Sequence, residues 1–190
     1  MAVDLIPLRG EALRERLDDI ARLRCAVFRD WPYLYDGDEA YERAYLASLA
    51  SGDGLAVLAL DGERAVGVST AMPLAEAQSE FAGVKLRADE WYYLAESVLL
   101  PDYRGQGVGV RFFEAREDAA REAGFARACF CAVQRPDDHP ARPPDHQPLN
   151  DFWRRRGYAP MEGVTATFAW REIGAERELD HTMQFWGKTI

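Results

Sequence analysis

A glycine-rich turn past the middle of the chain has the residue types of a phosphate-binding loop. It lies between an apolar run and an amphipathic helix, and it reads Arg104-Gly105-Gln106-Gly107-Val108-Gly109. Glycines let the backbone approach a ligand closely, and the first N–H groups of a helix attract anions because they have no partner within the helix. With the fixed positive charge of Arg104 at its mouth, the turn predicts a site for a phosphate or pyrophosphate.

Two widespread phosphate-binding patterns do not fit this turn. The dinucleotide fingerprint requires Gly-x-Gly-x-x-Gly near the start of a domain, whereas these glycines alternate and lie late in the chain. A P-loop requires Lys followed by Ser or Thr after its last glycine, and neither pair follows here. An ordinary corner between a strand and a helix is the structural alternative.

The surrounding order of elements resembles the GCN5-related N-acetyltransferase (GNAT) family. An apolar strand, a Pro-Asp-Tyr turn, the pattern Arg-x-x-Gly-x-Gly and a helix follow one another. In that family the turn binds the pyrophosphate of acetyl-coenzyme A (acetyl-CoA), and the open edge of the strand pairs with the pantetheine arm as an added strand would. The resemblance implies that the cofactor is bound by Val98, Leu99, Leu100, Arg104, Gly105, Gln106, Gly107, Val108 and Gly109.

A second family motif, Asn-x-x-Ala-x-x-Leu-Tyr-x-x-x-Gly-Phe, is matched only in its second half, over residues 149–158. Trp153 stands where the family has a tyrosine that often protonates the departing thiolate, and an indole N–H is far too weak an acid for that role. The resemblance implies that Trp153 packs against the cofactor and that His146 or Asn150 contacts the pantetheine. Tyr158 is a candidate for the acid, or else a core aromatic. Since a free thiol has a pKa of about 8.5, the thiolate also leaves acceptably without an acid.

Acetylation of an amine requires a base, and Glu96 is the predicted one. A primary amine has a pKa of about 10.4, so it arrives protonated and must lose a proton before its nitrogen attacks a thioester. Glu96 stands in the middle of the run Leu-Ala-Glu-Ser-Val-Leu-Leu-Pro, where an ionisable side chain is costly without a purpose. The alternatives are that Glu96 pairs with an arginine or lysine, or bonds to backbone where the sheet opens. Leu99 on the same strand is the expected N–H donor to the oxyanion.

An aromatic loop over residues 31–38 is expected to form the acceptor side of the site. The rings of Trp31, Tyr33 and Tyr35 lie close to two carboxylates in the sequence, which suits an organic cation. The alternative is a loop packed onto the core, in which Asp36 and Asp38 act as a turn residue and a helix cap. In the family, the segments that correspond to the proline-rich residues 134–148 and to the last two strands also line the acceptor side of the site. The two histidines of the proline-rich segment match no zinc spacing, so no metal is expected.

Hydrophobic periodicity predicts one domain over residues 1–190. It predicts helices over residues 10–28, 39–50, 110–123 and 149–156, and strands over residues 3–8, 55–60, 65–71, 90–100, 126–133, 164–172 and 181–186. Residues 134–148 carry five prolines and are expected to form a lid rather than a helix or strand. By resemblance, the fold is α/β (α+β), with a mixed, mostly antiparallel sheet splayed between strands four and five and about four flanking helices.

Charge and composition limit the partners. The net charge of −9 argues against nucleic acid and suits a cationic substrate. The first residues lack the pattern of a signal peptide and no run is long enough to span a membrane, so a cytoplasmic protein without a membrane partner is expected. Cys25, Cys129 and Cys131 are interpreted as reduced, small apolar residues. Phe185 and Trp186, taken as exposed aromatics near the C-terminus, are compatible with a homodimer.

The sequence therefore predicts an enzyme that transfers the acetyl group of acetyl-CoA to a primary amine of a small molecule, by direct attack in a ternary complex. Acetylation of a protein N-terminus or of a lysine side chain is the alternative within this enzyme class. A regulatory domain that binds acyl-CoA without catalysis is the alternative outside it. The presence of Trp153 in place of tyrosine supports that last alternative.

Overall fold

The computed structural model describes residues 3–77, 81 and 83–190, and it contains one mixed sheet. The sheet has the strand order β1-β2-β3-β4-β6-β8-β7, with β5 paired to β3. Its strands are β1 (Asp4–Leu8), β2 (Leu55–Asp61), β3 (Arg64–Pro73), β4 (Tyr92–Tyr93), β5 (Ser97–Leu99), β6 (Arg127–Val133), β7 (Ala159–Trp170) and β8 (Leu179–Thr189). All neighbouring strands are antiparallel except β4 and β6.

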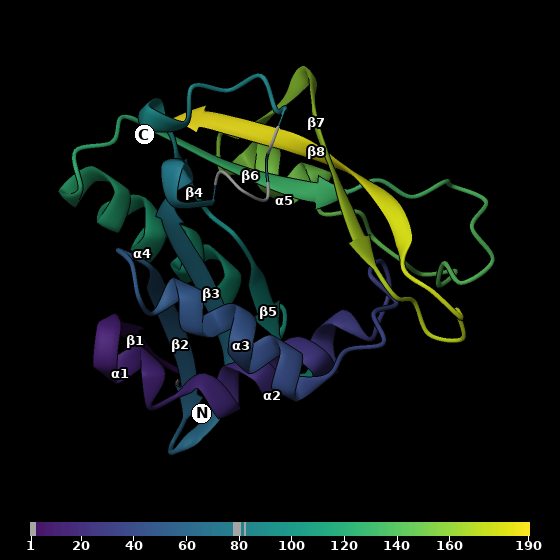
Figure 1. The fold of residues 1–190 in the computed structure, drawn as a ribbon, viewed down its shortest axis with the longest axis horizontal. Helices are drawn as coiled ribbons and strands as arrows, with labels where there is room; N and C mark the ends of the chain where they lie inside the picture. The colour runs from purple at the N-terminus through teal and green to yellow at the C-terminus, as the bar shows by residue number, and fades with distance from the viewer. Residues whose placement is uncertain (1–2, 78–80, 82) are drawn as a thin grey trace.

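Five α-helices accompany the sheet within the described residues: α1 (Gly10–Arg14), α2 (Leu17–Phe28), α3 (Glu39–Leu49), α4 (Val108–Glu122) and α5 (Asn150–Arg155). Helices α2 and α3 cover one face of β3 and β5, where Leu46 packs with Val68 and Val98 (Figure 1). Helix α4 covers the other face through Phe112, which packs with Val66. Within the described chain, no helix has the length and apolar character needed to cross a membrane.

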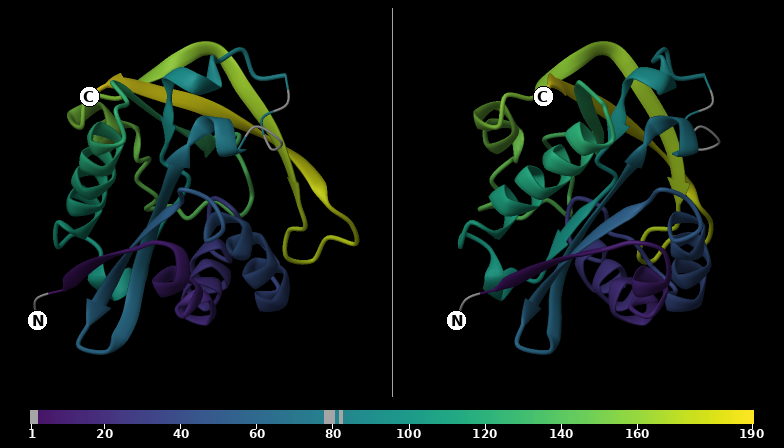
Figure 2. Two further views of the ribbon diagram at one scale, coloured as in Figure 1. Left: turned by 60° about the vertical axis from the view of Figure 1, so that its left-hand side comes forward. Right: turned by 90° about the vertical axis from the view of Figure 1, so that its left-hand side faces the viewer.

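The sheet splays open where β4 ends, as predicted. Strand β4 pairs with β6 only through Tyr92 and Tyr93, and the N–H of Leu94 adds one bond to the carbonyl of Cys129 at 2.8 Å. Beyond this point β5 stays with β3, while β6 continues with β8. Figure 2 shows the two halves of the sheet diverging from there. The open side of β5 is therefore free to receive another extended chain.

Two of the predicted helices differ in detail from the structure. The helix expected over residues 10–28 is interrupted between α1 and α2. Asp18 and Asp19 lie in the first turn of α2, where acidic residues favour a new helix N-terminus, and Arg16 just before it donates to Asp19 at 2.8 Å. In α3 the spacing of the aromatics predicts a face of Tyr41, Tyr45 and Leu49, whereas the buried residues are Glu42, Leu46 and Leu49, and Tyr41 is exposed.

The expectation of exposed aromatics near the C-terminus is wrong. Phe185 is 0% exposed and Trp186 is 4% exposed. Both lie on β8 and, as consecutive residues of a strand, point to opposite faces of the sheet. Phe185 packs in the cluster that includes Val68 and Val98, and Trp186 packs against Phe130 and Trp153 on the other face. These two residues therefore give no support to a homodimer.

Replacing Phe185 with alanine tests this placement. Removing a fully buried phenylalanine leaves a cavity, and we expect Phe185→Ala to lower the free energy of unfolding by about 3–5 kcal/mol. Tyr41→Ala is the matched control because Tyr41 is 65% exposed, and surface substitutions change stability by about 0.5 kcal/mol or less. Chemical denaturation measures both values. Similar small losses in the two variants would contradict the buried position of Phe185.

Candidate active site

A β-bulge interrupts the central strand at Ala95 and Glu96. Tyr93 lies opposite Met72, and Ser97 lies opposite Ser69, so the chain advances four residues against three on β3. The extra residue is accommodated at Thr70, whose carbonyl accepts from the N–H of Ala95 and whose N–H donates to the carbonyl of Glu96, both at 3.0 Å. Two residues opposite one define a bulge, and bulges redirect side chains next to active sites.

The bulge turns the side chain of Glu96 to the face covered by α2 and α3. With the regular period of two, Glu96 would share a face with Leu94, which packs in the cluster beneath α4. Instead its carboxylate pairs with Arg24 of α2, and the side chain is 10% exposed. The structure therefore shows the arginine partner that was the alternative expectation for Glu96. An ion pair with Arg24 is compatible with a role of Glu96 as the base.

Arg24 is shared between two buried carboxylates. Its guanidinium donates to Glu42 of α3 and forms an ion pair with Glu96. It also lies over the rings of Phe28 and Tyr45, at 5.1 and 4.9 Å from their centroids. Burial alone would lower the pKa of Arg24, but the two carboxylates outweigh burial and raise it. Arg24 therefore stays charged between the two carboxylates.

A second arginine, Arg116 of α4, holds the bulge from the opposite face. Its side chain is 2% exposed and donates to the carbonyls of Thr70 at 3.4 Å and Glu96 at 3.1 Å, as well as to Phe112 in its own helix. Burial lowers the pKa of Arg116 to about 10. Both carbonyls also accept a backbone N–H across the bulge, so the guanidinium occupies the second acceptor position of each. Sequence reasoning missed both arginines, because each acts on residues far away in the chain.

The strand after the bulge leaves backbone groups facing the opened side of the sheet. Glu96 bonds to β3 through its carbonyl, which accepts from the N–H of Thr70, and Leu100 bonds to β3 by donating to the carbonyl of Val66 at 2.9 Å. Along an antiparallel strand, residues whose N–H and C=O groups bond to the partner strand alternate with residues whose groups point away from it. Ser97 and Leu99 are of the second kind, so their backbone groups face outward. The carbonyl of Leu99 accepts from Arg104 Nε at 3.1 Å. Leu99 thus has the orientation expected of an oxyanion donor, and that role remains a prediction.

The glycine turn, here called the cradle, has the backbone conformation expected of an anion site at the start of α4, and anion binding there remains a prediction. Gly107 is the residue before the helix, and its φ of +80°, like the +75° of Gly105, lies in the region that favours glycine. A Cβ added at either residue would meet no atom within 4 Å, so the space above the turn is open. The first helical bonds run from Val110 and Arg111 to Gly107. The N–H groups ahead of those bonds point out of the helix end toward an anion.

Helix α5 lies beside this cradle. A Cβ at Gly109 would be 3.5 Å from the ring of Phe152. Asn150 is exposed at the first residue of α5. Trp153 packs edge-on against Phe130 and Trp186, with ring centroids 5.0 and 5.1 Å away. Contacts of Asn150 and Trp153 with a cofactor remain predictions, but the position of α5 next to the glycine turn is compatible with them.

Tyr158 is held in the core. It is 1% exposed, and its hydroxyl donates to Glu117 at 3.0 Å. Glu117 also accepts from Lys188 at 2.9 Å. Burial raises the pKa of Tyr158, and the Glu117 carboxylate raises it further. A raised pKa makes the hydroxyl a weaker acid, so these contacts agree with the alternative of a core aromatic and give the predicted acid role no geometric support.

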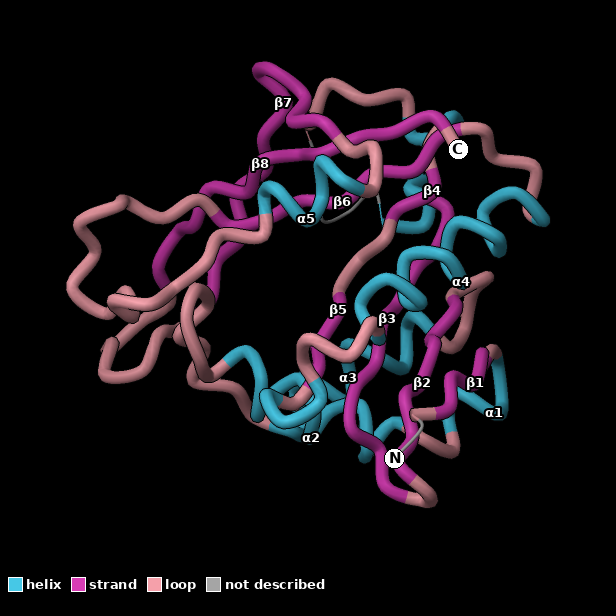
Figure 3. Tube along the Cα trace, turned by 180° about the vertical axis from the view of Figure 1, so that it is seen from behind, coloured by secondary structure: helices cyan, strands magenta, loops and turns pink. Residues whose placement is uncertain are grey.

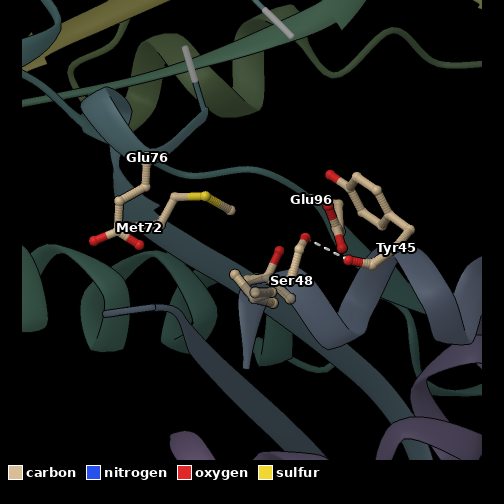
Figure 4. Close-up of a pocket in the computed structure, with 7 residues that line it drawn as sticks. Tyr45, Ser48, Met72, Glu76 and Glu96 are labelled. Carbon is tan, nitrogen blue, oxygen red and sulfur yellow. Dashed lines mark hydrogen bonds between the residues drawn. The ribbon is translucent and has the colours of Figure 1, made fainter. Parts of the chain in front are cut away.

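A small pocket lies next to Glu96 on the side covered by α3. It has a volume of about 70 Å³ and is lined by Tyr45, Ser48, Leu49, Thr70, Met72, Glu76 and Glu96. Figure 4 shows Glu96 beside Tyr45, with Met72 between Glu96 and Glu76 (Figure 4). No local sequence pattern indicates this pocket, because its residues come from α3, β3, the segment after β3 and the bulge.

The loop predicted to bind substrate lies elsewhere, and none of its three aromatics lines this pocket. Trp31 packs against His139 and His146 of the proline-rich segment, at 5.0 and 5.8 Å between ring centroids. This segment has no helix or strand and lies next to the loop after α2 (Figure 3). The ring of Tyr33 packs on Phe28, with centroids 4.6 Å apart.

Tyr33 and Tyr35 nevertheless lie near the charged group around Arg24. Burial raises the pKa of Tyr33, and Cys131 and Glu96 add to the shift. Burial raises the pKa of Tyr35 as well, and a hydrogen bond with Glu42 contributes. Asp38 caps α3 by accepting from the N–H of Tyr41 at 2.8 Å, as the alternative reading of the loop expected.

Solved structures share this fold at low sequence identity. PaiA N-acetyltransferase from Thermoplasma acidophilum, in complex with coenzyme A, has a TM-score of 0.58 and 12% identity over 100% of both chains. Ribosomal-protein-alanine N-acetyltransferase from Brucella melitensis has a TM-score of 0.63 and 12% identity over 97% of this chain and 99% of that one. An aminoglycoside 6′-N-acetyltransferase complexed with coenzyme A has a TM-score of 0.63 and 16% identity over 100% and 97%.

These matches define the class of fold, that of N-acetyltransferases. The model of the family described as "Acetyltransferase (GNAT) family" matches residues 19–158. The chain therefore belongs to the GNAT family of acetyltransferases. No curated protein matches it.

Alanine at Gly107 tests the cradle, and Gly124 provides a matched control at the other end of α4. Both glycines have positive φ, +80° and +85°, and open space at the Cβ position. Each substitution should cost about 1 kcal/mol of stability through backbone strain. Only Gly107→Ala should weaken binding of coenzyme A, by about tenfold or more, because it disturbs the N–H groups of the cradle. Calorimetry measures the affinity, and equal affinities in the two variants would contradict the site.

Proposed function

We propose that the chain transfers the acetyl group of acetyl-CoA to a primary amine of a small molecule, and that Glu96 takes the proton of that amine. The observation that carries the proposal is the position of Glu96. The bulge brings an almost fully buried carboxylate to the point where the sheet opens, next to a pocket. A base must lie within hydrogen-bond reach of the proton that it removes.

The residues present fit acetyl-CoA. The N–H groups at the start of α4 and the open space above Gly105 and Gly107 suit a pyrophosphate. The outward backbone groups of Ser97 suit an amide of a pantetheine arm, which would add to the edge of β5 as a strand does, and the N–H of Leu99 remains for the oxyanion. This edge runs from the glycine turn back to the bulge, so a bound thioester would be directed toward Glu96.

The reaction then follows from ordinary acyl transfer. Glu96 takes one proton from the ammonium group, and the free amine nitrogen then attacks the thioester carbon to form a tetrahedral intermediate. The carbon–sulfur bond breaks to release coenzyme A as a thiolate, and the second proton lost by the nitrogen passes to solvent. The N–H of Leu99 is the proposed donor to the oxyanion of the tetrahedral intermediate. No protein acid is needed in this scheme, because a thiolate is an acceptable leaving group near neutral pH. This agrees with Trp153 at the usual tyrosine position and with the hydroxyl of Tyr158 bonded to Glu117.

Replacing Glu96 with glutamine tests the base. We expect Glu96→Gln to lower kcat by about 100-fold to 10,000-fold, the usual contribution of a general base. Glu42→Gln is the matched control, because it removes a carboxylate charge from the same guanidinium. Thiol release from acetyl-CoA across a panel of amines measures both rates, and coenzyme A affinity reports whether each variant is folded.

The outcomes separate the base from the ion pair. A large loss in Glu96→Gln with at most a tenfold loss in Glu42→Gln is expected of a base. Equal losses would assign Glu96 to structure alone. If the wild-type protein binds coenzyme A but acetylates no small amine, a protein amine or a regulatory role for acyl-CoA binding replaces the proposal.

A further inference from the structure

We infer that Arg135 is a positioning residue for the acceptor side of the site, because it fixes the loop of residues 31–38 and, through Tyr33, the group around Glu96. The inference rests on the proposed function and deepens it. Three segments meet at Arg135: this loop, the proline-rich residues 134–148 and the hairpin that joins β7 to β8. Figure 3 shows them together at one end of the molecule.

Arg135 uses its whole guanidinium to join the three segments. Its Nε donates to the carbonyl of Pro32 at 2.7 Å, and its Nη2 donates to the carbonyl of Tyr33 at 3.0 Å. Its Nη1 forms an ion pair of 2.6 Å with Glu172 in the hairpin, and the two side chains are only 10% and 15% exposed. The guanidinium fork holds several acceptors in one fixed geometry. The loop is therefore fixed at two consecutive carbonyls.

Aromatic rings enclose this guanidinium. It lies 6.0 Å from the ring centroid of Trp31 and 5.9 Å from that of Trp170, at the distance of a cation–π contact. The ring of His181 on β8 stacks on Trp170 at 3.6 Å. The indole Nε1 of Trp170 donates to the carbonyl of Tyr33 at 2.9 Å. This one carbonyl therefore accepts from two side chains of different segments, Arg135 and Trp170.

The residue after Tyr33 shows that the loop depends on such contacts. Leu34 has a φ of +54°, in the left-handed region that a bulky side chain rarely adopts. Such a conformation persists only where the surrounding structure determines it, and it is frequent at functional sites. The carbonyl of Leu34 accepts from the N–H of Ile173 at 2.8 Å, and the N–H of Asp36 donates to the carbonyl of Arg171 at 2.9 Å. The hairpin therefore holds the loop in a conformation that is unfavourable by itself.

The fixed loop directs the side chain of Tyr33 to the group around Glu96. The ring of Tyr33 packs on Phe28, with centroids 4.6 Å apart, and the guanidinium of Arg24 lies 5.1 Å from the centroid of the same Phe28 ring. Arg24 in turn pairs with Glu96. Burial raises the pKa of Tyr33, and Cys131 and Glu96 raise it further, so its hydroxyl stays protonated near the base. A shift of the loop would therefore disturb the aromatic support of the arginine that orients Glu96.

Hydrogen exchange in Arg135→Gln tests whether Arg135 fixes the loop. The N–H groups of Asp36 and Ile173, which bond across the loop and the hairpin, should exchange faster by about tenfold or more, the effect of losing one charge-assisted hydrogen bond. Arg142→Gln is the matched control, because Arg142 lies in the same proline-rich segment and pairs with Asp137, whose side chain is 99% exposed. It changes the net charge equally and should leave both exchange rates unchanged.

Steady-state kinetics test the consequence for the acceptor. The probes are acetyl-CoA with butylamine, benzylamine or 2-phenylethylamine. We expect Arg135→Gln to raise the KM for the amine and to lower its kcat/KM by about tenfold or more. The KM for acetyl-CoA and the affinity for coenzyme A should stay unchanged, because the described contacts of Arg135 are with the loop and the hairpin, away from the glycine turn and β5. A role in stability alone would lower kcat through the folded fraction and leave the KM for the amine unchanged.

Trp170→Phe gives a second test, which also serves if Arg135→Gln fails to fold. Phenylalanine keeps an aromatic ring beside His181 and Arg135 but lacks the N–H that donates to the carbonyl of Tyr33. We expect changes in the same direction, with faster exchange of the same two N–H groups and a lower kcat/KM for the amine, by about threefold to tenfold for one neutral hydrogen bond.

The results distinguish this inference from the proposed function. Unchanged exchange in Arg135→Gln and Trp170→Phe overturns the inference, and so does faster exchange without a change in the kinetics of the amine. Equal effects in Arg142→Gln would assign them to net charge and overturn it as well. In each of these cases the acetyltransferase proposal stays intact. Binding of coenzyme A without acetylation of any amine overturns the proposed function itself, and with it the role of Arg135 on the acceptor side.

Discussion

The pairing of Thr70 with two consecutive residues, Ala95 and Glu96, determines the rest of the site. Because of this single extra residue, the carboxylate of Glu96 faces α2 and α3 instead of the cluster beneath α4. The same irregularity coincides with the end of the pairing between β4 and β6. The bulge therefore lies where the sheet opens, and it places an ionisable group at the opening.

Two buried arginines stabilise this arrangement from opposite faces of the sheet. Arg116 donates to the carbonyls of Thr70 and Glu96, and Arg24 holds the carboxylate of Glu96 together with that of Glu42. Buried charges persist only where partners compensate for lost hydration. Glu42 has a further role in the proposed reaction. When Glu96 takes a proton and loses its negative charge, Arg24 still has the carboxylate of Glu42 as its partner.

Features that depend on residues close together in the chain could be predicted from the sequence, and features that depend on contacts between distant residues could not. The turn from Arg104 to Gly109 and the cap at Asp38 depend on neighbouring residues, so their patterns were readable. The position of Glu96 within an apolar strand was readable too, but the bulge is set by register against β3, which no local pattern encodes. The pairing of Arg24 with Glu96 joins residues far apart in the chain, and the burial of Phe185 depends on distant residues, such as Phe81, that pack over the face of β8.

The central claim is that the bulge places the proton acceptor where the bound thioester meets the amine. A crystal structure with a bisubstrate analogue, in which coenzyme A is joined through an acetyl bridge to the amine, tests it most directly. The account predicts the pyrophosphate at the N-terminus of α4, the pantetheine beside Ser97 and Leu99, and the amine nitrogen within hydrogen-bond distance of Glu96. An amine nitrogen outside that distance and next to a different ionisable side chain would contradict it.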